Sequence, residues 1–426
     1  MKTQTETQRT TITKEVTCPY CSLLCDDLVI QNDNETLKVI ENGCHLARSG
    51  FENSVPSAQA RIKGKNSGID AAIKEAARIL KRSKLPLIAG LGTDLAGMRA
   101  VMQLAEASGA VIDHMHNHGS VKNSLVLQDL GWIMTTLAEI RNRADLVIFA
   151  GTDATNYPRF YERVIHNRKT LFRGSLKNRQ VVYIGEDLKT SKGRTNSGQR
   201  PIYIKCKQEH IGEIISVIHT MIVGDHIDSD VIHGVKLKTL VDLAQRMKEA
   251  SYGVIVWAPG ELTFPHAELT IQNFCELIKY LTRKTRFAGF SLGGNDGGTT
   301  AVNVSAWQCG YPLRVSFNKG YPEYDPHIYS ASNVLKTRRV DSMLWISSIS
   351  SDVKPPKAGI PSILLASPQT RIGYRPDVFI PVGTPGVDHK GHLFRTDSVV
   401  SLPLKQLRHG ELYQVSDVLG KINELL

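Results

Sequence analysis

Four of the seven cysteines in this 426-residue chain lie within its first 44 residues, where they could share a metal. Cys18, Cys21 and Cys25 form the pattern C-x2-C-x3-C in the stretch TCPYCSLLCDD, and Cys44 follows in a returning segment. Three thiols from one loop and a fourth from elsewhere suit a 4Fe-4S cluster or tetrahedral zinc. Spacing alone does not separate these two, and four buried thiols without a metal are the third alternative.

A second set of possible ligands is the run DHMHNHGS, which contains His114, His116 and His118. On an extended strand, alternate side chains point to one face, so three imidazoles could bind zinc. The alternative is a loop with ordinary hydrogen-bonding histidines, and we favour it.

The elements that must position these residues follow a repeating α/β pattern. Apolar residues have helical spacing over 67–83, and a short apolar strand that ends in glycine follows at 85–94. Similar strands recur in RADLVIFAGTD, RQVVYIGED, SYGVIVWAPG, VDSMLWISS and IPSILLAS. Strands alternating with helices predict an α/β fold of open, doubly wound, mainly parallel sheets with helices on both faces.

Loops that leave the carboxyl ends of such strands are where ligands bind in doubly wound sheets. The loops GLGTD, AGTDATNYPR, IGED and APGEL are therefore candidate cofactor contacts. They contain Gly151, Thr152, Asp153 and Gly185. For any one of these glycines, the alternative is a tight turn that needs no ligand.

Composition limits the class of protein. The length predicts two to four domains, and 41% hydrophobic residues are enough for buried cores. The polar, Thr-rich start lacks a secretory signal, and no segment approaches the roughly 20 apolar residues of a membrane span. The scattered remaining cysteines do not form a disulfide framework. We therefore expect a cytoplasmic protein with reduced thiols and no membrane partner.

The net charge of +11 raises the question of an acidic partner, and much of it lies between residues 166 and 200. The segment has no helix-turn-helix, zinc-finger or RNP pattern, so we do not expect nucleic acid. A solvated basic face and a site for an anionic ligand are the alternatives.

Several motifs together resemble the B subunit of formylmethanofuran dehydrogenase, a member of the molybdopterin oxidoreductase superfamily. They are TCPYCSLLCDDL with NGCHLA, RADLVIFAGTDATNYPR, FAGFSLGGNDGG, WQCGYPLRVSFNKGYPEYDP and PDVFIPVGTPGVDHKGHLFRTD. The resemblance implies a small N-terminal cysteine-cluster domain at 1–62. It further implies a discontinuous α/β domain at 63–129 and 251–426, and an inserted α/β domain at 130–250. In redox members, the two α/β domains clamp a pterin cofactor.

The chain departs from the redox members at their metal site. Those proteins carry a tungsten- or molybdenum-ligating cysteine before histidine and glycine, whereas here Asn117 precedes His118 and Gly119. An amide lacks the anionic sulfur that such centres use. The family's active-site arginine has its nearest match around Ser291, and Arg286 lies five residues earlier.

A third departure lies in a pterin-binding loop. A motif that commonly reads G-x-N-P in relatives reads Gly151, Thr152, Asp153, Ala154 here, and a carboxylate would repel the pterin diphosphate. We therefore expect a vacated pterin site that holds no Mo or W. Whether the chain is itself an enzyme stays open. By the resemblance, Asp388, His389 and His392, which could form a base with an orienting carboxylate, line the cleft, and we assign them no catalytic role.

These departures fit the B-like subunit of the bacterial formyltransferase/hydrolase complex in tetrahydromethanopterin- and methanofuran-linked one-carbon metabolism. The resemblance implies a structural or accessory role beside formyltransferase and amidohydrolase-like subunits. It also implies a poly-glutamylated methanofuran-type carrier as a partner for residues 166–200. At the four cysteines it favours a 4Fe-4S cluster over zinc or no metal, because the spacing matches the family ligands. The alternatives are an active Mo/W-pterin formylmethanofuran dehydrogenase subunit and a free-standing zinc-binding scaffold.

Overall fold

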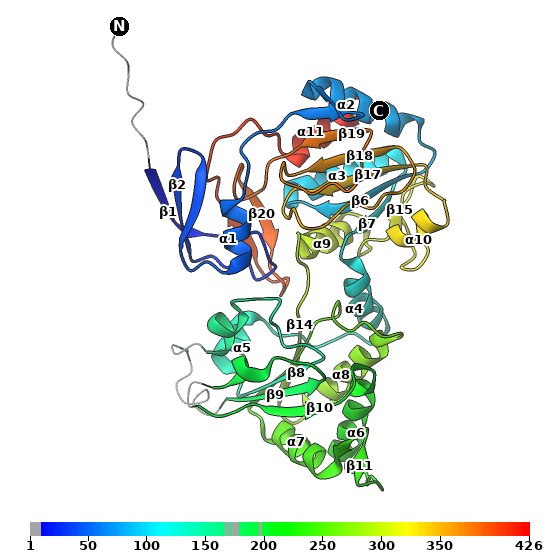
Figure 1. The fold of residues 1–426 in the computed structure, drawn as a ribbon. Helices are drawn as coiled ribbons and strands as arrows, with labels where there is room; N and C mark the ends of the chain where they lie inside the picture. The colour runs from blue at the N-terminus through cyan, green and yellow to red at the C-terminus, as the bar shows by residue number, and fades with distance from the viewer. Residues whose placement is uncertain (1–9, 167–169, 172–178, 196–197) are drawn as a thin grey trace. The chain divides into compact units, whose positions relative to one another are not determined.

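The structure is a computed structural model that describes residues 10–166, 170–171, 179–195 and 198–426. The chain divides into two compact units, and the division falls within one helix, between Asn117 and His118. Unit 1 consists of Met1–Asn117 and Gly294–Leu426, and unit 2 of His118–Gly293. Figure 1 labels the elements of both units.

The largest sheet of unit 1 has nine strands in the order β16-β15-β7-β6-β17-β18-β19-β4-β5. The five central strands, β7 to β19 in this order, are parallel, and antiparallel strands extend both edges. The strands of this sheet are β4 (Ala60–Ile62), β5 (Lys65–Ser67), β6 (Pro86–Gly92), β7 (Val111–His114), β15 (Val315–Ser316), β16 (Glu323–Tyr324), β17 (Ser342–Ser347), β18 (Ser362–Ala366) and β19 (Val378–Pro381).

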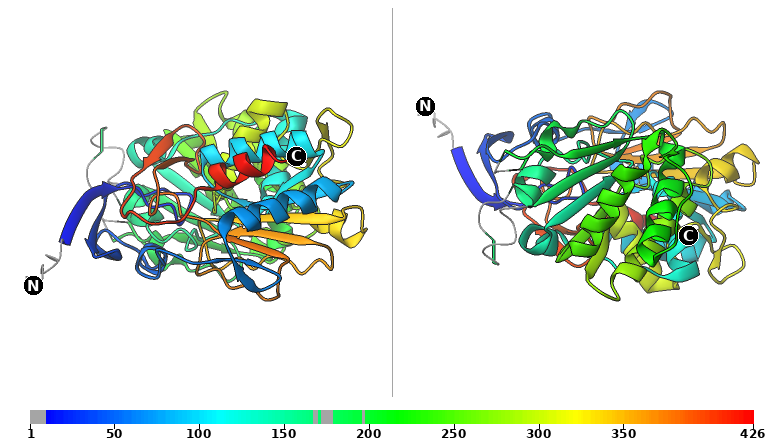
Figure 2. Two further views of the ribbon diagram at one scale, coloured as in Figure 1. Left: turned by 90° about the horizontal axis from the view of Figure 1, so that it is seen from above. Right: turned by 90° about the horizontal axis from the view of Figure 1, so that it is seen from below.

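Both faces of this sheet are covered, as expected for a doubly wound sheet. Along β17, Leu344 and Ile346 pack into one apolar cluster, whereas Met343 and Trp345 pack into another on the opposite face. The helices of the first face are α2 (Ile69–Arg82), α3 (Leu95–Ser108), α9 (Gly298–Cys309) and α11 (Val415–Asn423); α10 (Ala331–Lys336) covers the second. Figure 2 shows α11, in red, packed beside α2 and α3.

The cysteines belong to the N-terminal part of unit 1. A three-stranded antiparallel sheet has the order β1-β2-β3, and a helix follows it. A separate antiparallel pair, β20 and β21, lies near the end of the chain. These elements are β1 (Thr10–Val16), β2 (Leu28–Asp33), β3 (Thr36–Glu41), α1 (His45–Glu52), β20 (Gly391–Phe394) and β21 (Ser401–Leu404).

Unit 2 contains a five-stranded parallel sheet in the order β10-β9-β8-β13-β14. The first strand in sequence, β8, is central, so the chain switches direction between β8 and β13. Its strands are β8 (Leu146–Ala150), β9 (Gln180–Gly185), β10 (Ile202–Lys205), β13 (Tyr252–Trp257) and β14 (Arg286–Ser291), and a hairpin is formed by β11 (Val231–Ile232) and β12 (Val235–Lys236).

Helices cover both faces of this second sheet as well. One face carries an aliphatic cluster with α6, α7 and α8, and the other carries the aromatic side chains of Phe149, Phe160, Tyr161 and Tyr183. The helices of unit 2 are α4 (Asn117–Leu130, which begins in unit 1), α5 (Leu137–Arg143), η1 (Tyr161–Ile165), η2 (Thr190–Gly193), η3 (Gln208–His210), α6 (Ile211–Val223), α7 (Leu237–Glu249) and α8 (Ala267–Leu281).

The expected fold class, α/β with mainly parallel, doubly wound sheets, is confirmed. The boundaries differ from those expected, because β13 pairs with β8 and β14 pairs with β13, so both belong to unit 2 instead of the discontinuous domain that we placed at 251–426. Alternating strands and helices indicate a parallel sheet but not which of two sheets a strand joins. None of the described helices is long and apolar enough to cross a bilayer.

Candidate functional site

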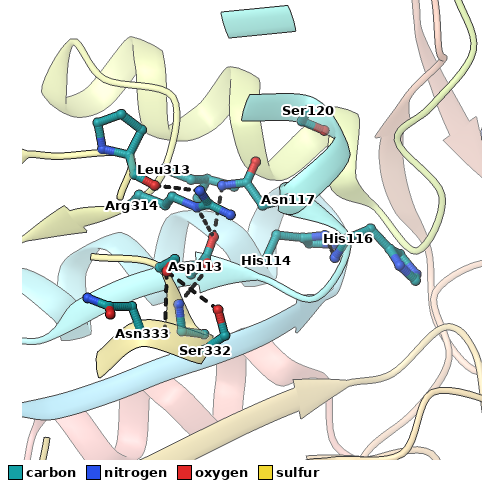
Figure 3. Close-up of polar contacts among 12 residues, drawn as sticks. Asp113, His114, His116, Asn117, Ser120, Leu313, Arg314, Ser332 and Asn333 are labelled. Carbon is teal, nitrogen blue, oxygen red and sulfur yellow. Dashed lines mark hydrogen bonds and ion pairs between the residues drawn. The ribbon is translucent and has the colours of Figure 1, made fainter. Parts of the chain in front are cut away.

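Asn117, which stands where the resemblance places a metal-ligating cysteine, has its side chain bonded within the protein. Its Nδ2 donates to Oδ1 of Asp113 over 2.8 Å, and both residues are buried. Nε of Arg314 lies 3.5 Å from the same oxygen, and the Ala331 backbone N–H donates to Oδ2 over 2.8 Å. Figure 3 shows the Asn117 and Arg314 side chains converging on Asp113 from separate elements. The amide therefore completes an internal polar cluster.

Burial governs the protonation of this cluster. It raises the pKa of Asp113, although the Arg314 guanidinium and hydrogen bonds from Ala331 and Asn117 act in the opposite direction. The carboxylate accepts from an amide and a backbone N–H and forms an ion pair with the Arg314 guanidinium, so its oxygens are already engaged. A ligand that entered here would have to break these contacts.

The neighbouring histidines do not form the three-imidazole face that an extended strand would give. The strand β7 ends at His114, a turn follows, and Asn117 begins α4. Nδ1 of His114 accepts from the His116 backbone N–H over 3.1 Å, so its Nε2 carries the proton and donates to the Asp296 carbonyl over 3.0 Å. Nε2 of His116 lies 2.7 Å from Oδ2 of Asp296. His118 is the first residue of unit 2.

Burial also determines the charge of His114. It lowers the pKa of this imidazole to about 4, and the charge of His116 acts in the same direction. His114 is therefore neutral at pH 7. With both ring nitrogens engaged, it holds the Asp296 turn in place and is not available as a metal ligand.

The cysteine loop (residues 17–26) is closed by backbone hydrogen bonds. The Cys18 N–H donates to the Cys25 carbonyl over 2.8 Å, and the Leu24 N–H donates to the Cys21 carbonyl over 3.1 Å. Cys44 immediately precedes α1. The Tyr20 ring packs edge-on against Phe51 of α1, with ring centroids 5.0 Å apart, so the loop and the helix that follows Cys44 are held together.

The four thiols are near enough to influence one another electrostatically. Burial raises the pKa of Cys18, and repulsion from Cys21, Cys25 and Cys44 raises it further. Burial and the charge of Cys25 raise the pKa of Cys21 to about 12. No three of these sulfurs lie within 4.8 Å of one another in the described structure.

A small gap, too tight to hold a water molecule, lies beside the cysteine loop within unit 1. Its lining includes Cys21 and Ser22 from the loop and Gly294, Asp296 and Gly297 from the turn before α9. The Ser22 N–H donates to Oδ1 of Asn295 over 2.9 Å, which ties the loop to this turn. The cysteine loop is therefore hydrogen-bonded to the turn that carries Asp296, the partner of His116.

In unit 2, the expected cofactor contact Gly151 lies at the carboxyl end of β8, next to the switch point of the sheet. It has a φ of +68°, and a Cβ added there would lie 2.5 Å from Cδ2 of Leu262. The Leu262 side chain is fully buried. Gly151 therefore lets the loop after β13 pack its own leucine against the end of β8.

Asp153 and Thr152 also make their contacts with neighbouring parts of unit 2. The Asp153 carboxylate accepts from the Thr155 backbone and from the Lys189 backbone, at 2.9 and 2.8 Å. Partial burial opposes ionisation, but these bonds and that of the Thr155 hydroxyl outweigh it and lower the pKa of Asp153. Thr152 is buried and accepts from the Ala154 N–H over 3.1 Å. Gly185, at the end of β9, also lies against a leucine side chain: a Cβ added there would be 3.1 Å from Cδ1 of Leu188.

Ser291 and Arg286 occupy opposite ends of β14. Oγ of Ser291, at the carboxyl end, accepts from Asn123 over 2.8 Å, and Oδ1 of Asn123 accepts from Trp257 over 2.9 Å. Arg286 is the first residue of the strand and is exposed. It therefore does not replace the family arginine at the ligand-binding end of this sheet.

Asp388 and His389 do not form a base with an orienting carboxylate. Asp388 makes a buried ion pair with Arg408, whose Nε lies 2.6 Å from Oδ1. Nδ1 of His389 lies 2.8 Å from the Lys390 carbonyl and donates to it, because a carbonyl only accepts. His392 lies on β20 and is exposed. Arg408 also donates to carbonyl oxygens of Glu35 and Ser54, at 3.4 and 3.1 Å, and so joins the chain end to the N-terminal part of unit 1.

The basic segment 166–200 falls partly on residues 167–169, 172–178 and 196–197, which lie outside the described residues. Among the described basic side chains of this segment, that of Arg179 is buried. The guanidinium donates to five carbonyl oxygens, those of Ile140, Arg141, Ala144, Val164 and Ile165. Burial lowers its pKa to about 10. Arg179 therefore holds segments of unit 2 together through its hydrogen bonds and is not part of an exposed basic face.

Sequence reasoning missed the partners of Asn117 and His116, namely Asp113, Arg314 and Asp296. Asp113 gave a usable signal, because an acidic residue stands directly after the apolar pair Val111 and Ile112 of a buried strand. Such a carboxylate needs a buried partner. Nothing local to Arg314 marks it as that partner.

No family model matches the chain. The B subunit of the tungsten-containing formylmethanofuran dehydrogenase 2 of Methanocaldococcus jannaschii is 26% identical over 404 residues, which cover 91% of this chain and 92% of that protein. The corresponding protein of Methanococcus maripaludis is 25% identical over 402 residues, with the same coverage. The B subunit of the formyltransferase/hydrolase complex of Methylorubrum extorquens is 28% identical over 338 residues, 79% of this chain and 88% of that protein.

The solved structures agree with these sequence relatives. A chain of the Methylorubrum extorquens formyltransferase/hydrolase complex, solved with methylofuran, aligns with a TM-score of 0.72 and 26% identity over 86% of this chain and 98% of its own length. Acetylene hydratase from Pelobacter acetylenicus aligns with a TM-score of 0.65 and 11% identity, over 97% of this chain and 69% of its own. The resemblance in the motifs is therefore confirmed: the chain is a homologue of formylmethanofuran dehydrogenase and formyltransferase/hydrolase B subunits, with a molybdopterin-type fold.

Proposed function

We propose that this chain is a non-redox B-like subunit of a cytoplasmic formyltransferase/hydrolase complex in one-carbon metabolism, with a structural or accessory role. The observation that carries the proposal is the bonding of Asn117. The side chain of Asn117 has an amide in place of a metal-binding thiolate. This amide donates to the buried carboxylate of Asp113, which also forms an ion pair with Arg314. A molybdenum or tungsten centre would lose its protein thiolate ligand and would have to displace this cluster.

The loops of unit 2 support the same proposal. Next to the switch point of the sheet, the Leu262 side chain occupies the space beside Gly151. The Asp153 carboxylate accepts backbone hydrogen bonds, which lower its pKa and keep it ionised. An anionic diphosphate beside this carboxylate would be repelled. We therefore propose that a former pterin site now has a structural role in these loops. Its residues are Gly151, Thr152, Asp153 and Gly185.

For the cysteines we propose a 4Fe-4S cluster bound by Cys18, Cys21, Cys25 and Cys44. The support is their shared electrostatic environment, a spacing in the sequence that suits the ligands of such a cluster, and the closed backbone of the cysteine loop. Such a cluster would supply one-electron chemistry if a partner delivered electrons. In this protein its expected effect is to fix the loop against α1.

The proposed partners are formyltransferase and amidohydrolase-like subunits together with a poly-glutamylated methanofuran-type carrier. Their support is the relative solved in the formyltransferase/hydrolase complex with methylofuran, and the net charge of +11 on this chain. A second candidate function is that of an active formylmethanofuran dehydrogenase subunit. The specific observation in its favour is that relatives named as tungsten-containing match over 91% of the chain.

Metal analysis separates the two candidates. The protein would be purified anaerobically with its native partners, and Fe, Zn, Mo and W would be measured per chain, together with dye reduction by a formylated carrier. The non-redox proposal expects neither Mo nor W and no dye reduction. Stoichiometric Mo or W with electron transfer would overturn it, and Fe with acid-labile sulfide would support the cluster at the cysteines.

A further inference from the structure

We propose that His210, Glu213 and His233 form a surface binding site for Zn²⁺ or a similar divalent transition-metal ion in unit 2. None of these three residues belongs to the four cysteines or to the loops that contain Gly151–Asp153 and Gly185. One ligand atom from each of the three residues lies within 4.8 Å of the other two, and they form the one such group in the described part of the chain.

Three elements that are close in sequence bring the ligands together. His210 ends η3, and Glu213 lies in the first turn of α6. His233 comes from the hairpin between β11 and β12. Nε2 of His233 is hydrogen-bonded to Oε2 of Glu213, and the His210 and His233 rings stack with centroids 3.9 Å apart and planes 10° from parallel.

This arrangement places three metal-binding groups together. Each imidazole has a ring nitrogen that can bind a metal, and the carboxylate supplies oxygen ligands. Two imidazoles and one carboxylate are a common zinc ligand set, which leaves a fourth tetrahedral position for water. The His210 and His233 side chains are 29% and 30% exposed, so both rings can turn toward a shared ion.

The charges around the site also suit a cation. Oε1 of Glu209 lies 3.8 Å from Nε2 of His210, close enough to orient that ring or to approach the ion. Nζ of Lys207 lies 3.8 Å from the same oxygen of Glu209. Glu209 and Glu213 thus place two carboxyl groups beside the histidines.

The backbone at His233 is a second indication. His233 has a φ of +46° and is followed by Gly234 at +80°, as in a two-residue hairpin turn in which asparagine and glycine are preferred. A histidine here costs conformational free energy relative to asparagine, yet it carries an imidazole over the start of α6. A bound ion would cross-link the β11–β12 hairpin to α6, and the hairpin has little other pairing.

The test compares His233→Asn with His266→Asn in the full-length chain. His266 is a matched control because it also has a positive φ, of +58°, and lies 3.3 Å from a glutamate, Glu268, but it belongs to no group of three ligands. Asparagine fits both backbones. Equilibrium dialysis against Zn²⁺ would measure stoichiometry and affinity, and Co²⁺ absorption would separate this site, which lacks thiolate charge-transfer bands, from the cysteines.

We expect His233→Asn to bind about one Zn²⁺ fewer per chain, or to weaken this site about 100-fold, while His266→Asn binds as the unchanged protein does. Glu213→Gln should give the same loss as His233→Asn with α6 intact by circular dichroism. Equal binding by His233→Asn and His266→Asn would overturn the proposal. So would Co²⁺ spectra in which every bound ion shows thiolate bands.

Discussion

The amide of Asn117 donates a 2.8 Å hydrogen bond to the buried carboxylate of Asp113, at the position where the resemblance expects a metal-binding thiolate. The bond changes what a substitution at this position would do. Restoring the cysteine would not simply restore a metal site, because it would also remove a donor from a carboxylate that is already costly to bury.

Asn117→Cys should therefore lower the free energy of unfolding by about 1–3 kcal/mol without adding Mo or W, because a thiol is a poor donor to the carboxylate. Urea denaturation and metal analysis would measure the two effects. Asn117→Ala is the matched control, and it should show the same loss of stability and the same absence of Mo and W as Asn117→Cys. A cysteine variant that gained Mo or W and dye reduction would show that the pterin site is still intact.

His114 should make stability fall as the pH is lowered. Its pKa in the folded state is about 4, below the ordinary value of about 6.5, so the unfolded chain takes up the proton first. The stabilisation present above pH 6.5 is lost as the pH falls toward 4, by up to about 3 kcal/mol. His114→Gln, which can still donate to the Asp296 carbonyl, should remove this part of the pH dependence.

Denaturation of both proteins in urea between pH 4 and pH 7 would measure the difference. His266→Gln, at an exposed position in unit 2, serves as the control and should keep the slope of the unchanged protein. Parallel pH profiles for His114→Gln and the unchanged protein would contradict the prediction.

Gly151→Ala should destabilise unit 2 by about 3 kcal/mol, because alanine disfavours a φ of +68° and its Cβ would overlap Leu262. Thermal or urea unfolding would measure this. Combining Gly151→Ala with Leu262→Ala should relieve the overlap, so the two losses should sum to more than the loss of the double variant. Gly260→Ala, which would meet no atom within 4 Å, is the control. Strictly additive losses would mean that contact with Leu262 is not the reason why position 151 requires glycine.

Arg408→Met should cost about 3–5 kcal/mol, because it leaves the Asp388 carboxylate buried without its cation. Since Arg408 also donates to the Glu35 and Ser54 carbonyls, the N-terminal part of unit 1 should become more accessible to limited proteolysis. Arg78→Met, which breaks the exposed ion pair with Glu75, should leave both measurements nearly unchanged. Unaltered cleavage in Arg408→Met would show that this region is held by other contacts.

The individual elements could be predicted from sequence because their signals are local. The apolar positions of 67–83 repeat with helical spacing, and α2 forms at Ile69–Arg82. The assignment of β13 and β14 to unit 2 could not be predicted, since it depends on the pairing of β13 with β8, more than 100 residues away in sequence.

The same distinction applies to the candidate site. The cysteine spacing is a local signal, and it predicts a metal site that stays a prediction; the structure shows that backbone hydrogen bonds close the loop. The Asn117–Asp113–Arg314 cluster joins positions nearly 200 residues apart, from 117 to 314. Likewise, His210 and His233 carry no shared motif, and only the turn at β11–β12 brings them together.

The Arg179 guanidinium, directly before β9, donates to carbonyl oxygens at the ends of two helices. Val164 and Ile165 end η1, and Ile140 and Arg141 lie in the last turn of α5. The last carbonyl groups of a helix have no partner within that helix, and the negative end of the helix dipole lies there. One buried cation therefore caps two helices at once, and both caps depend on the same side chain.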